Sequence, residues 1–314
     1  MNIFITGAGG YIGGSVAMAL VAAGHRVRGL TRGAANAERL AASGIEPVTG
    51  ALDDAEVLTR EARASDAVIN TASADHAGAV QALIAGLEGS GKPLLHTSGS
   101  SVVGDDARGS RGSEQVFDED STLVVSPTKQ PRRELDLRVL GASAVGIRSA
   151  VICPSLIYGA GRGLNPSSVQ IPFLVANARE HGVVQVVGAG LNTWSNVHID
   201  DVVQLYLLAL DRAPGGALYF AENGEASFGD IGAALARRLG LRGVESLPPE
   251  VAAARWGESK AYYTLGSNSR VRARRARQEL GWAPRHASVI EWIRTDMPLE
   301  PANTGAAPQT SFNS

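Results

Sequence analysis

The sequence predicts an α/β protein with a doubly wound parallel sheet, and three observations support this fold class. Short apolar runs alternate with helical stretches through the first 150 residues. The runs are too apolar to keep one face in water, which is typical of strands covered on both sides. Several helical stretches end on glycine, as at Gly24 and Gly44, where a glycine closes a helix well. Right-handed crossovers between such strands place helices on both faces of the sheet.

The alternation is regular in the first half of the chain and looser after Pro154. The strands expected in the first half are Asn2–Thr6, Arg26–Thr31, Ile45–Val48, Ala67–Ala72, Pro93–Ser98 and Val145–Ile152, and the helices include Tyr11–Ala23, Ala34–Ser43 and Ala77–Leu87. In the second half the expected helices are Ser167–His181, Ile199–Arg212, Phe228–Leu239, Arg270–Leu280 and Ser288–Asp296, with strands at Val183–Val187 and Leu218–Ala221.

Composition excludes several classes of protein. Lys+Arg number 29 and Asp+Glu 31, a formal net charge of −2, so no global field attracts nucleic acid or an anionic membrane. No apolar run approaches the roughly 20 residues that cross a bilayer. One cysteine, Cys153, allows no internal disulfide and no thiolate metal site, and a reducing compartment is expected. With no leader at the N-terminus, the expectation is a cytoplasmic protein without a metal.

The strongest local motif is the glycine-rich segment 6–13, Thr-Gly-Ala-Gly-Gly-Tyr-Ile-Gly, between the first strand and the first helix. In this context Gly7 allows a tight turn, Gly10 lets backbone approach a diphosphate, and Gly13 lets the helix pack closely on the strand. A diphosphate then lies on the free N–H groups of the helix N-terminus, those of Tyr11 and Ile12 included. The alternative is a glycine-rich turn that only packs. The motif predicts a Rossmann-type site for a pyridine dinucleotide.

The end of the second strand indicates which dinucleotide is bound. NAD sites usually place a carboxylate there to bind the ribose 2′-hydroxyl. Here the strand ends Gly-Leu-Thr-Arg at residues 29–32, and no carboxylate follows until Glu38. Arg32 can bind a 2′-phosphate with charge-assisted hydrogen bonds, so NADP is favoured over NAD. An exposed arginine without a ligand is the alternative.

An ordered set of motifs resembles the extended short-chain dehydrogenase/reductase family, the NAD(P)-dependent epimerase/dehydratase group. Besides the glycine motif, the matches are Asn70-Thr71-Ala72, Thr97-Ser98-Gly99, residues 154–159, residues 194–201 and Leu280-Gly281-Trp282-Ala283-Pro284. The resemblance implies that Leu52, Thr71 and Ala72 lie along the adenine and its ribose. It also implies a Rossmann domain over 1–160, to which 196–215 returns, and a smaller α/β substrate domain over 161–297. The polar segment 298–314 is expected to be disordered.

The chain departs from this family at the expected reaction centre. The family uses a Tyr-x-x-x-Lys pair, and no tyrosine occurs between Tyr11 and Tyr158. The best overlay places Thr128 at the tyrosine position and Arg132 at the lysine position, and neither exchanges a proton at neutral pH. Arg132 can still bind the nicotinamide ribose as the family's lysine does, unless it is an ordinary surface arginine. Ser98, or a neighbouring hydroxyl, is expected to orient the substrate oxygen.

Substitutes for the missing acid/base are sought at the carboxyl ends of the strands, where ligands of such sheets bind. His76 titrates near neutrality and Asp75 could fix its tautomer, although Asp75 also serves as a plain cap for Ala77–Leu87. Tyr158 is a second candidate and Lys129 a weaker third. His198 is expected to hold loop structure.

The sequence leaves three functions open. The leading one is an NADPH-dependent oxidoreductase acting on a small carbonyl or alcohol, because the loops expected to wall the substrate site, 162–170 and 192–196, are polar but not strongly basic. The alternatives are an NAD(P)-dependent sugar epimerase or dehydratase and a non-catalytic dinucleotide sensor. The five arginines between Arg270 and Arg277 are expected to form ion pairs on a solvated face. A homodimer is expected by analogy with the family.

Overall fold

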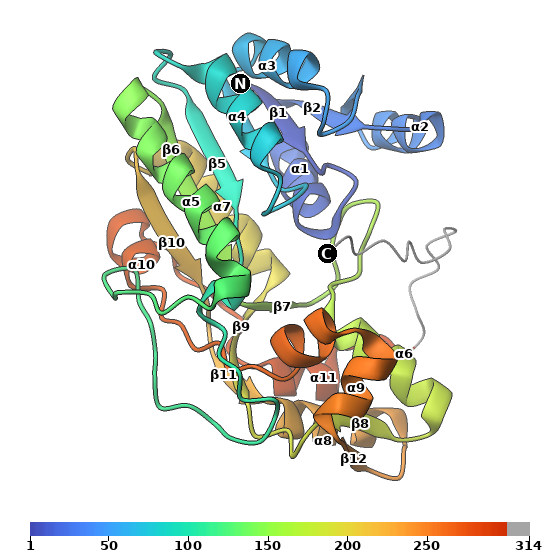
Figure 1. Ribbon diagram of the computed structural model, residues 1–314. Coiled ribbons are helices and arrows are strands. Elements are labelled where there is room, and N and C mark those ends of the chain that lie inside the picture. The colour runs from blue at the N-terminus through green and yellow to red at the C-terminus, as the bar shows by residue number, and fades with distance from the viewer. Residues whose placement is uncertain (300–314) are drawn as a thin grey trace.

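The computed structural model describes residues 1–299 and shows an upper unit built on a seven-stranded sheet and a smaller lower unit (Figure 1). The sheet has the order β10-β6-β5-β4-β1-β2-β3, and every pairing in it is parallel. Its strands are β1 (Asn2–Thr6), β2 (Arg26–Thr31), β3 (Glu46–Thr49), β4 (Ala67–Asn70), β5 (Pro93–Thr97), β6 (Arg148–Pro154) and β10 (Ala217–Ala221). The strand order reverses between β1 and β4, which opens a crevice at their carboxyl ends.

Helices cover both faces of the sheet, so the predicted doubly wound α/β fold is confirmed (Figure 1). One face carries α3 (Ala55–Ala64), α4 (Ala77–Leu87) and α5 (Gln130–Gly141), and the other carries α1 (Tyr11–Ala22) and α7 (Ile199–Arg212). The helix α2 (Ala34–Ala42) packs beside β3 at the sheet edge. The short helical turns η1 (Ser100–Val103), η2 (Pro127–Lys129) and η3 (Ala142–Val145) flank β5 and α5.

The lower unit lies beneath the carboxyl ends of the strands and has its own apolar core (Figure 1). It contains a three-stranded sheet of β7 (Leu156–Tyr158), β9 (Thr193–His198) and β11 (Glu225–Ser227), and a pair of β8 (Val184–Val187) and β12 (Val244–Leu247). Around them pack α6 (Gln170–His181), α8 (Phe228–Leu239), α9 (Pro249–Trp256), the π-helical turn η4 (Ser259–Thr264) and α11 (Val289–Thr295). Among the described residues, no helix is long and apolar enough to span a membrane.

The chain returns to the upper unit over a longer stretch than the expected 196–215. After α7, β10 pairs with β6 as the seventh strand, and α10 (Arg274–Leu280) packs against β10. The helix predicted over Arg270–Leu280 begins four residues later than expected, at Arg274, because Val271 pairs with Phe117 in a β-bridge. The predicted disordered tail, 298–314, falls for the most part outside the described residues.

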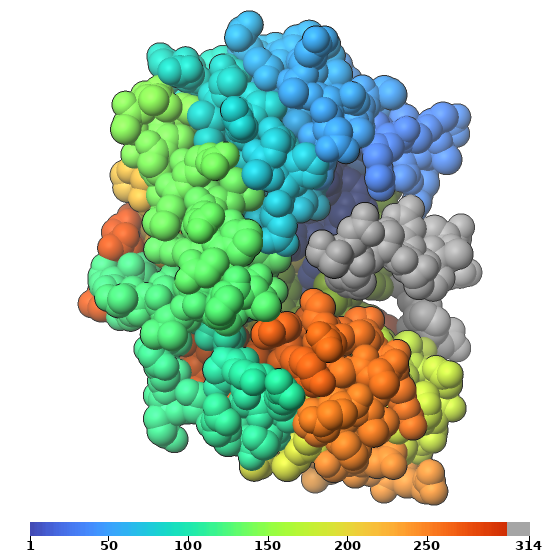
Figure 2. Space-filling view, in the orientation of Figure 1, coloured from blue at the N-terminus to red at the C-terminus, as the bar shows by residue number. Residues whose placement is uncertain are grey.

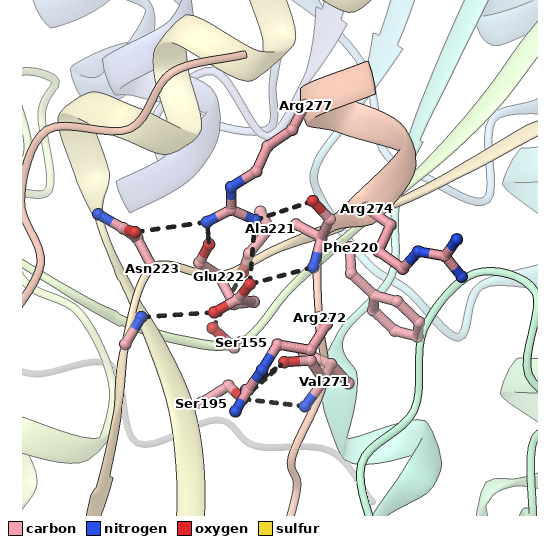
Figure 3. A network of polar contacts seen from close by, with 12 residues as sticks. Ser155, Ser195, Phe220, Ala221, Glu222, Asn223, Val271, Arg272, Arg274 and Arg277 are labelled. Carbon is pink, nitrogen blue, oxygen red and sulfur yellow. Dashed lines mark hydrogen bonds and ion pairs between the residues drawn. The ribbon is translucent and has the colours of Figure 1, made fainter. Parts of the chain in front are cut away.

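A polar network fastens this return, and Figure 3 shows its centre at Glu222. The buried carboxylate of Glu222 accepts hydrogen bonds from Arg277 Nη1 at 3.0 Å and from the backbone N–H of Ala273 at 3.1 Å. The other four arginines of the segment also pair with carboxylates. Arg270 and Arg272 bind Glu225, Arg274 binds Asp118, and Arg275 binds Asp120. The expectation of ion pairs is confirmed for this segment.

Candidate functional site

The glycine-rich turn between β1 and α1 is shaped to receive a phosphate group. Gly7 has a φ of 78°, a conformation that favours glycine, and its carbonyl accepts a hydrogen bond of 2.8 Å from the N–H of Gly10. A Cβ on Gly7 would lie 2.8 Å from the backbone nitrogen of Ala72, and one on Gly13 would overlap the Thr71 hydroxyl. Gly10 caps α1 without a side-chain hydrogen bond, so the first N–H groups of this helix are left for a ligand. These residues fit a dinucleotide diphosphate.

The side chains of Tyr11 and Thr71 hold the walls of this turn rather than face a ligand. The Tyr11 hydroxyl donates to the carbonyl of Gly159 at 2.8 Å, which ties α1 to the loop after β7. The Thr71 hydroxyl donates to the carbonyl of Thr6 at 2.7 Å and so joins the ends of β4 and β1. Ile12 is half-buried in the first turn of α1. Any contact of Tyr11 and Ile12 with the diphosphate is therefore through backbone N–H groups.

Arg32 lies at the far end of the crevice and is free to bind an anion. Its side chain is exposed directly after β2, and among residues 1–299 it has no hydrogen bond or ion pair. The following helix, α2, is capped by Gly33 without a side-chain hydrogen bond and has no acidic residue in its first turn. A guanidinium beside a helix N-terminus whose N–H groups have no side-chain cap is suited to binding a phosphate.

The loops after β3 and β4 meet beside the crevice, where the resemblance leads us to expect the adenine. Leu52 is half-buried and packs on the apolar core beneath it. Asp54 is exposed, and its Oδ2 accepts a hydrogen bond of 2.8 Å from the backbone N–H of Ala51. The remaining carboxylate, Asp53, lies 3.1 Å from Nε2 of His76 and joins the two loops.

His76 serves as the helix cap that we expected of Asp75. Its Nδ1 accepts a hydrogen bond of 3.0 Å from the N–H of Ala79 and so caps α4. The interpretation of Asp75 as a plain cap is therefore wrong. Both ring nitrogens of His76 are already engaged, Nε2 by Asp53, so a proton-transfer role would require it to release these partners.

Asp75 instead forms an ion pair with Arg132, the residue that the sequence overlay sets at the family's lysine position. Arg132 Nε donates to Asp75 Oδ1 at 2.7 Å, and Nη1 donates to the hydroxyl of Ser101 at 3.0 Å. The guanidinium thereby joins α5 to the loops after β4 and β5, and it lies beside Gly99. Its positive charge holds the pKa of Asp75 below the usual range. Arg132 is thus no ordinary surface arginine.

Ser98 faces inward and contacts the buried carboxylate of Asp136, which was not among the predicted site residues. Its hydroxyl donates to Asp136 Oδ2 at 2.8 Å, and both residues are buried. Burial raises the pKa of Asp136 to about 6. Asp136 follows Arg132 by one helical turn of α5, a spacing that could have identified it. Ser98 can orient a substrate oxygen only by giving up this hydrogen bond.

Tyr158 lies in the core of the lower unit and not at the crevice. Its side chain is fully buried, and its hydroxyl donates to the backbone carbonyl of His286 at 2.9 Å. Burial raises the pKa of this phenol further. These contacts are structural, and the buried hydroxyl is not placed to exchange a proton with a substrate in the crevice.

His198 also has the structural role expected of it. Its Nδ1 accepts a hydrogen bond of 3.1 Å from the N–H of Asp200 and caps α7. Ligand atoms of His198, Asp200 and His286 lie within 4.8 Å of one another, which raises the question of a metal. The two rings stack at 3.9 Å, and Nδ1 of His286 is taken by Asp201, so we assign no ion to this cluster.

The expected substrate wall is less polar than its sequence suggests. Asn192 and Asn196 are buried, and Asn192 Nδ2 donates to the backbone carbonyls of Leu265 and Ser267. The Asn192 amide therefore holds the start of β9 to the segment 265–267 instead of lining the crevice. Arg162, a candidate for binding a phosphate, is paired with Asp200 at 2.8 Å.

One pair of residues brings the two units together beside Arg132. Lys129, the last residue of η2, places its Nζ 5.7 Å from the ring centroid of Tyr263 on η4. The surface is hollowed between the N-terminal part, in blue, and the lower unit, in orange (Figure 2). Tyr263 was missed because it lies far along the chain from the family's tyrosine, and no local pattern marks it.

Comparison with known proteins agrees with this geometry. Residues 3–219 match the NAD dependent epimerase/dehydratase family. A 4-hydroxy-2-methyl-3-oxo-4-farnesyl-3,4-dihydroquinoline-1-oxide ketoreductase of Stigmatella aurantiaca is 29% identical and covers 98% of this chain and 99% of its own. A protein of Acremonium sp named Oxidase ucsJ is 32% identical and covers 97% and 99%.

A solved structure shows the same fold. The dTDP-glucose 4,6-dehydratase from Bacillus anthracis, in complex with NAD, has a TM-score of 0.74 at 18% identity and covers 94% of each chain. The strand order, the glycine turn and the family match all lead to one assignment. The chain belongs to the NAD-dependent epimerase/dehydratase family, as the resemblance predicted, and a nicotinamide dinucleotide is the cofactor of its oxidoreductase chemistry.

Proposed function

We propose that this protein is an NADPH-dependent reductase of small carbonyl compounds. The observation that carries the choice of cofactor is Arg32, an exposed guanidinium with no partner among residues 1–299, at the end of β2 where NAD sites place a carboxylate. When bound, NADPH supplies a hydride to the carbonyl carbon. The N–H groups of the glycine turn would hold its diphosphate, and Arg32 its 2′-phosphate.

Arg132 is the group that would position the other end of the cofactor. It stands at the family's lysine position and is fixed by Asp75 and Ser101, so its orientation is set before a ligand arrives. Such a cation can bind the nicotinamide ribose without exchanging a proton. A fixed guanidinium costs little reorganisation when the reactants bind.

A small ketone is favoured over a nucleotide sugar as the substrate. A sugar nucleotide carries a second diphosphate, which needs cations, and Arg162 is already paired with Asp200. The relative from Stigmatella aurantiaca is named a ketoreductase, which supports the same substrate class. The preferred direction is carbonyl reduction.

The test is consumption of NADPH by purified protein against a panel of small ketones, 3-oxo esters and quinones. We expect at least one of them to oxidise NADPH in stoichiometric amount, with NADH a poorer donor. Separate reactions with UDP-glucose and dTDP-glucose test the epimerase or dehydratase alternative. Conversion of a sugar nucleotide without net use of cofactor, or NADPH binding with no turnover in any reaction, would reject the proposal.

We further propose that the protein is a cytoplasmic homodimer. A single cysteine, Cys153, which is buried, suits a reducing compartment. Leu137 on α5 and Val145 in η3 are 50% and 40% exposed, and a second subunit would cover them. Light scattering on the purified protein tests the dimer, and a monomer mass at working concentration would refute it.

A further inference from the structure

The amine of Lys129 lies near Arg132 and Asp75, one residue after the position that overlays on the family's tyrosine. Lys129 follows Thr128, which overlays on the tyrosine position, and it directly precedes α5. Its Nζ is 5.7 Å from the ring centroid of Tyr263, within the range of a cation–π contact. Because Tyr263 belongs to η4 of the lower unit, the amine stands between the two units at the carboxyl end of the sheet.

The charges around this amine leave it without a carboxylate of its own. The charged and titratable groups that face it are Arg132 on α5, Asp75 after β4 and Tyr263 on η4. Asp75 is already bound by both Nε and Nη2 of Arg132. The half-buried ammonium has no hydrogen-bond acceptor among the described residues. Burial, together with the positive charge of Arg132, lowers the pKa of Lys129.

Lysine is also a rare choice of cation in this sequence. Only Lys92, Lys129 and Lys260 occur among its 29 basic residues, and the rest are arginines. Arginine serves equally well where only a fixed positive charge is needed, but it does not release its proton. A lysine that is desolvated and placed beside another cation can release one near neutral pH.

We propose that Lys129 donates the proton to the carbonyl oxygen of the substrate, and that the ring of Tyr263 holds its ammonium group in place. The inference rests on the carbonyl reduction proposed above. As the hydride that NADPH supplies bonds to the carbonyl carbon, the π-electron pair of the C=O bond moves onto oxygen. The N–H bond of the Lys129 ammonium breaks, its electron pair stays on nitrogen, and the proton bonds to that oxygen. Water then returns a proton to the neutral amine.

The first test measures the amine itself and needs no substrate. Acetic anhydride labelling of the folded protein across a pH series, read by mass spectrometry, follows the three lysines separately. We expect Lys129 to react at a lower pH than Lys92 and Lys260, and to be protected by NADPH. If Lys129 is labelled in step with the other two lysines at every pH, the proposal is overturned.

The second test separates charge from proton donation. Lys129→Arg keeps a cation over the ring but cannot donate, so kcat/KM should fall at least about 100-fold, the usual contribution of a general acid, with Kd for NADPH within about twofold. Tyr263→Phe keeps the ring and should retain most of the activity. For the wild type, kcat/KM should fall as pH rises through the lowered pKa, and Lys129→Arg should lose this limb.

The outcomes also distinguish this proposal from the proposed function. A Lys129→Arg variant that keeps more than a third of the activity shows that only the charge matters and refutes proton donation. A Tyr263→Phe variant that loses all activity, with Lys129→Arg active, assigns the proton to the phenol instead. If the wild type reduces no carbonyl compound at all, the proposed function fails, whereas the labelling result still decides whether Lys129 has the acidity claimed for it.

Discussion

Replacing Arg32 with alanine measures what one guanidinium contributes to the choice between NADPH and NADH. The side chain is exposed and makes no hydrogen bond within residues 1–299, so the fold should be unaffected. A hydrogen bond to a charged group contributes about 1.5–3 kcal/mol, and about 1.4 kcal/mol changes a dissociation constant tenfold. We expect Kd for NADPH to rise about 10- to 140-fold, and Kd for NADH to change by less than about twofold.

The assay is a fluorescence titration of each coenzyme at two salt concentrations. Because an exposed ion pair is screened over a Debye length of about 10 Å at 0.1 M, the preference of the wild type for NADPH should shrink at high salt. Arg63→Ala is the matched control, since Arg63 is exposed on α3 and its side chain makes no ion pair within the described chain. Equal losses for both coenzymes, or no loss for either, would refute recognition of the 2′-phosphate by Arg32.

Three further substitutions test the fold and the site. Gly13→Ala adds a methyl group that must displace α1 from the residues that follow β1 and β4. The Tm should therefore fall, and Kd for NADPH should rise at least about tenfold. Gly141→Ala is the control, because open space surrounds this position and neither quantity should change. Asp136→Asn tests a buried carboxyl whose pKa is raised to about 6. The protonated Asp136 carboxyl contributes stability below pH ~4, and this contribution is lost as the pH rises through 6. In urea unfolding, the wild type should therefore lose up to about 3 kcal/mol of unfolding free energy relative to the variant between pH 4 and 7. Parallel curves of unfolding free energy against pH for the two proteins would contradict this. Arg277→Met removes the cation that pairs with the buried carboxylate of Glu222, and the free energy of unfolding should fall by about 1–3 kcal/mol. An unchanged urea midpoint would show that the Arg277–Glu222 pair does not stabilise the fold.

The cofactor half of the protein could be predicted closely because its signals are local. The bounds of β1 and β2 were predicted to the residue, since β1 is an apolar run that ends at the glycine turn and β2, although it contains two arginines, lies between Gly24 and the exposed Arg32. In contrast, β7 and β9 were missed because three-residue and polar strands carry no clear alternation. The helix α3 was missed because much of it is charged and it buries little apolar surface.

The reaction centre could not be predicted, because it depends on contacts between distant segments. No spacing in the sequence shows that Arg132 binds Asp75, that Ser98 binds Asp136 or that Lys129 approaches Tyr263. Tyr158 was a reasonable candidate by position, yet its hydroxyl turns into the lower unit. Local sequence patterns thus predicted the glycine turn of the cofactor site, whereas the contacts among the candidate catalytic residues became visible only in the tertiary structure.

The return of α7, β10 and α10 to the upper unit has a consequence for folding. The central sheet cannot be completed until residues beyond 217 have been synthesised, and the lower unit is built from several chain segments that are separated by α7, β10 and α10 of the upper unit. We therefore expect a fragment ending near residue 160 to remain unfolded and the full chain to melt in a single cooperative transition. With several chain crossings between the units, large hinge rotation is restrained, and substrate selection falls to side chains and loops at the crevice.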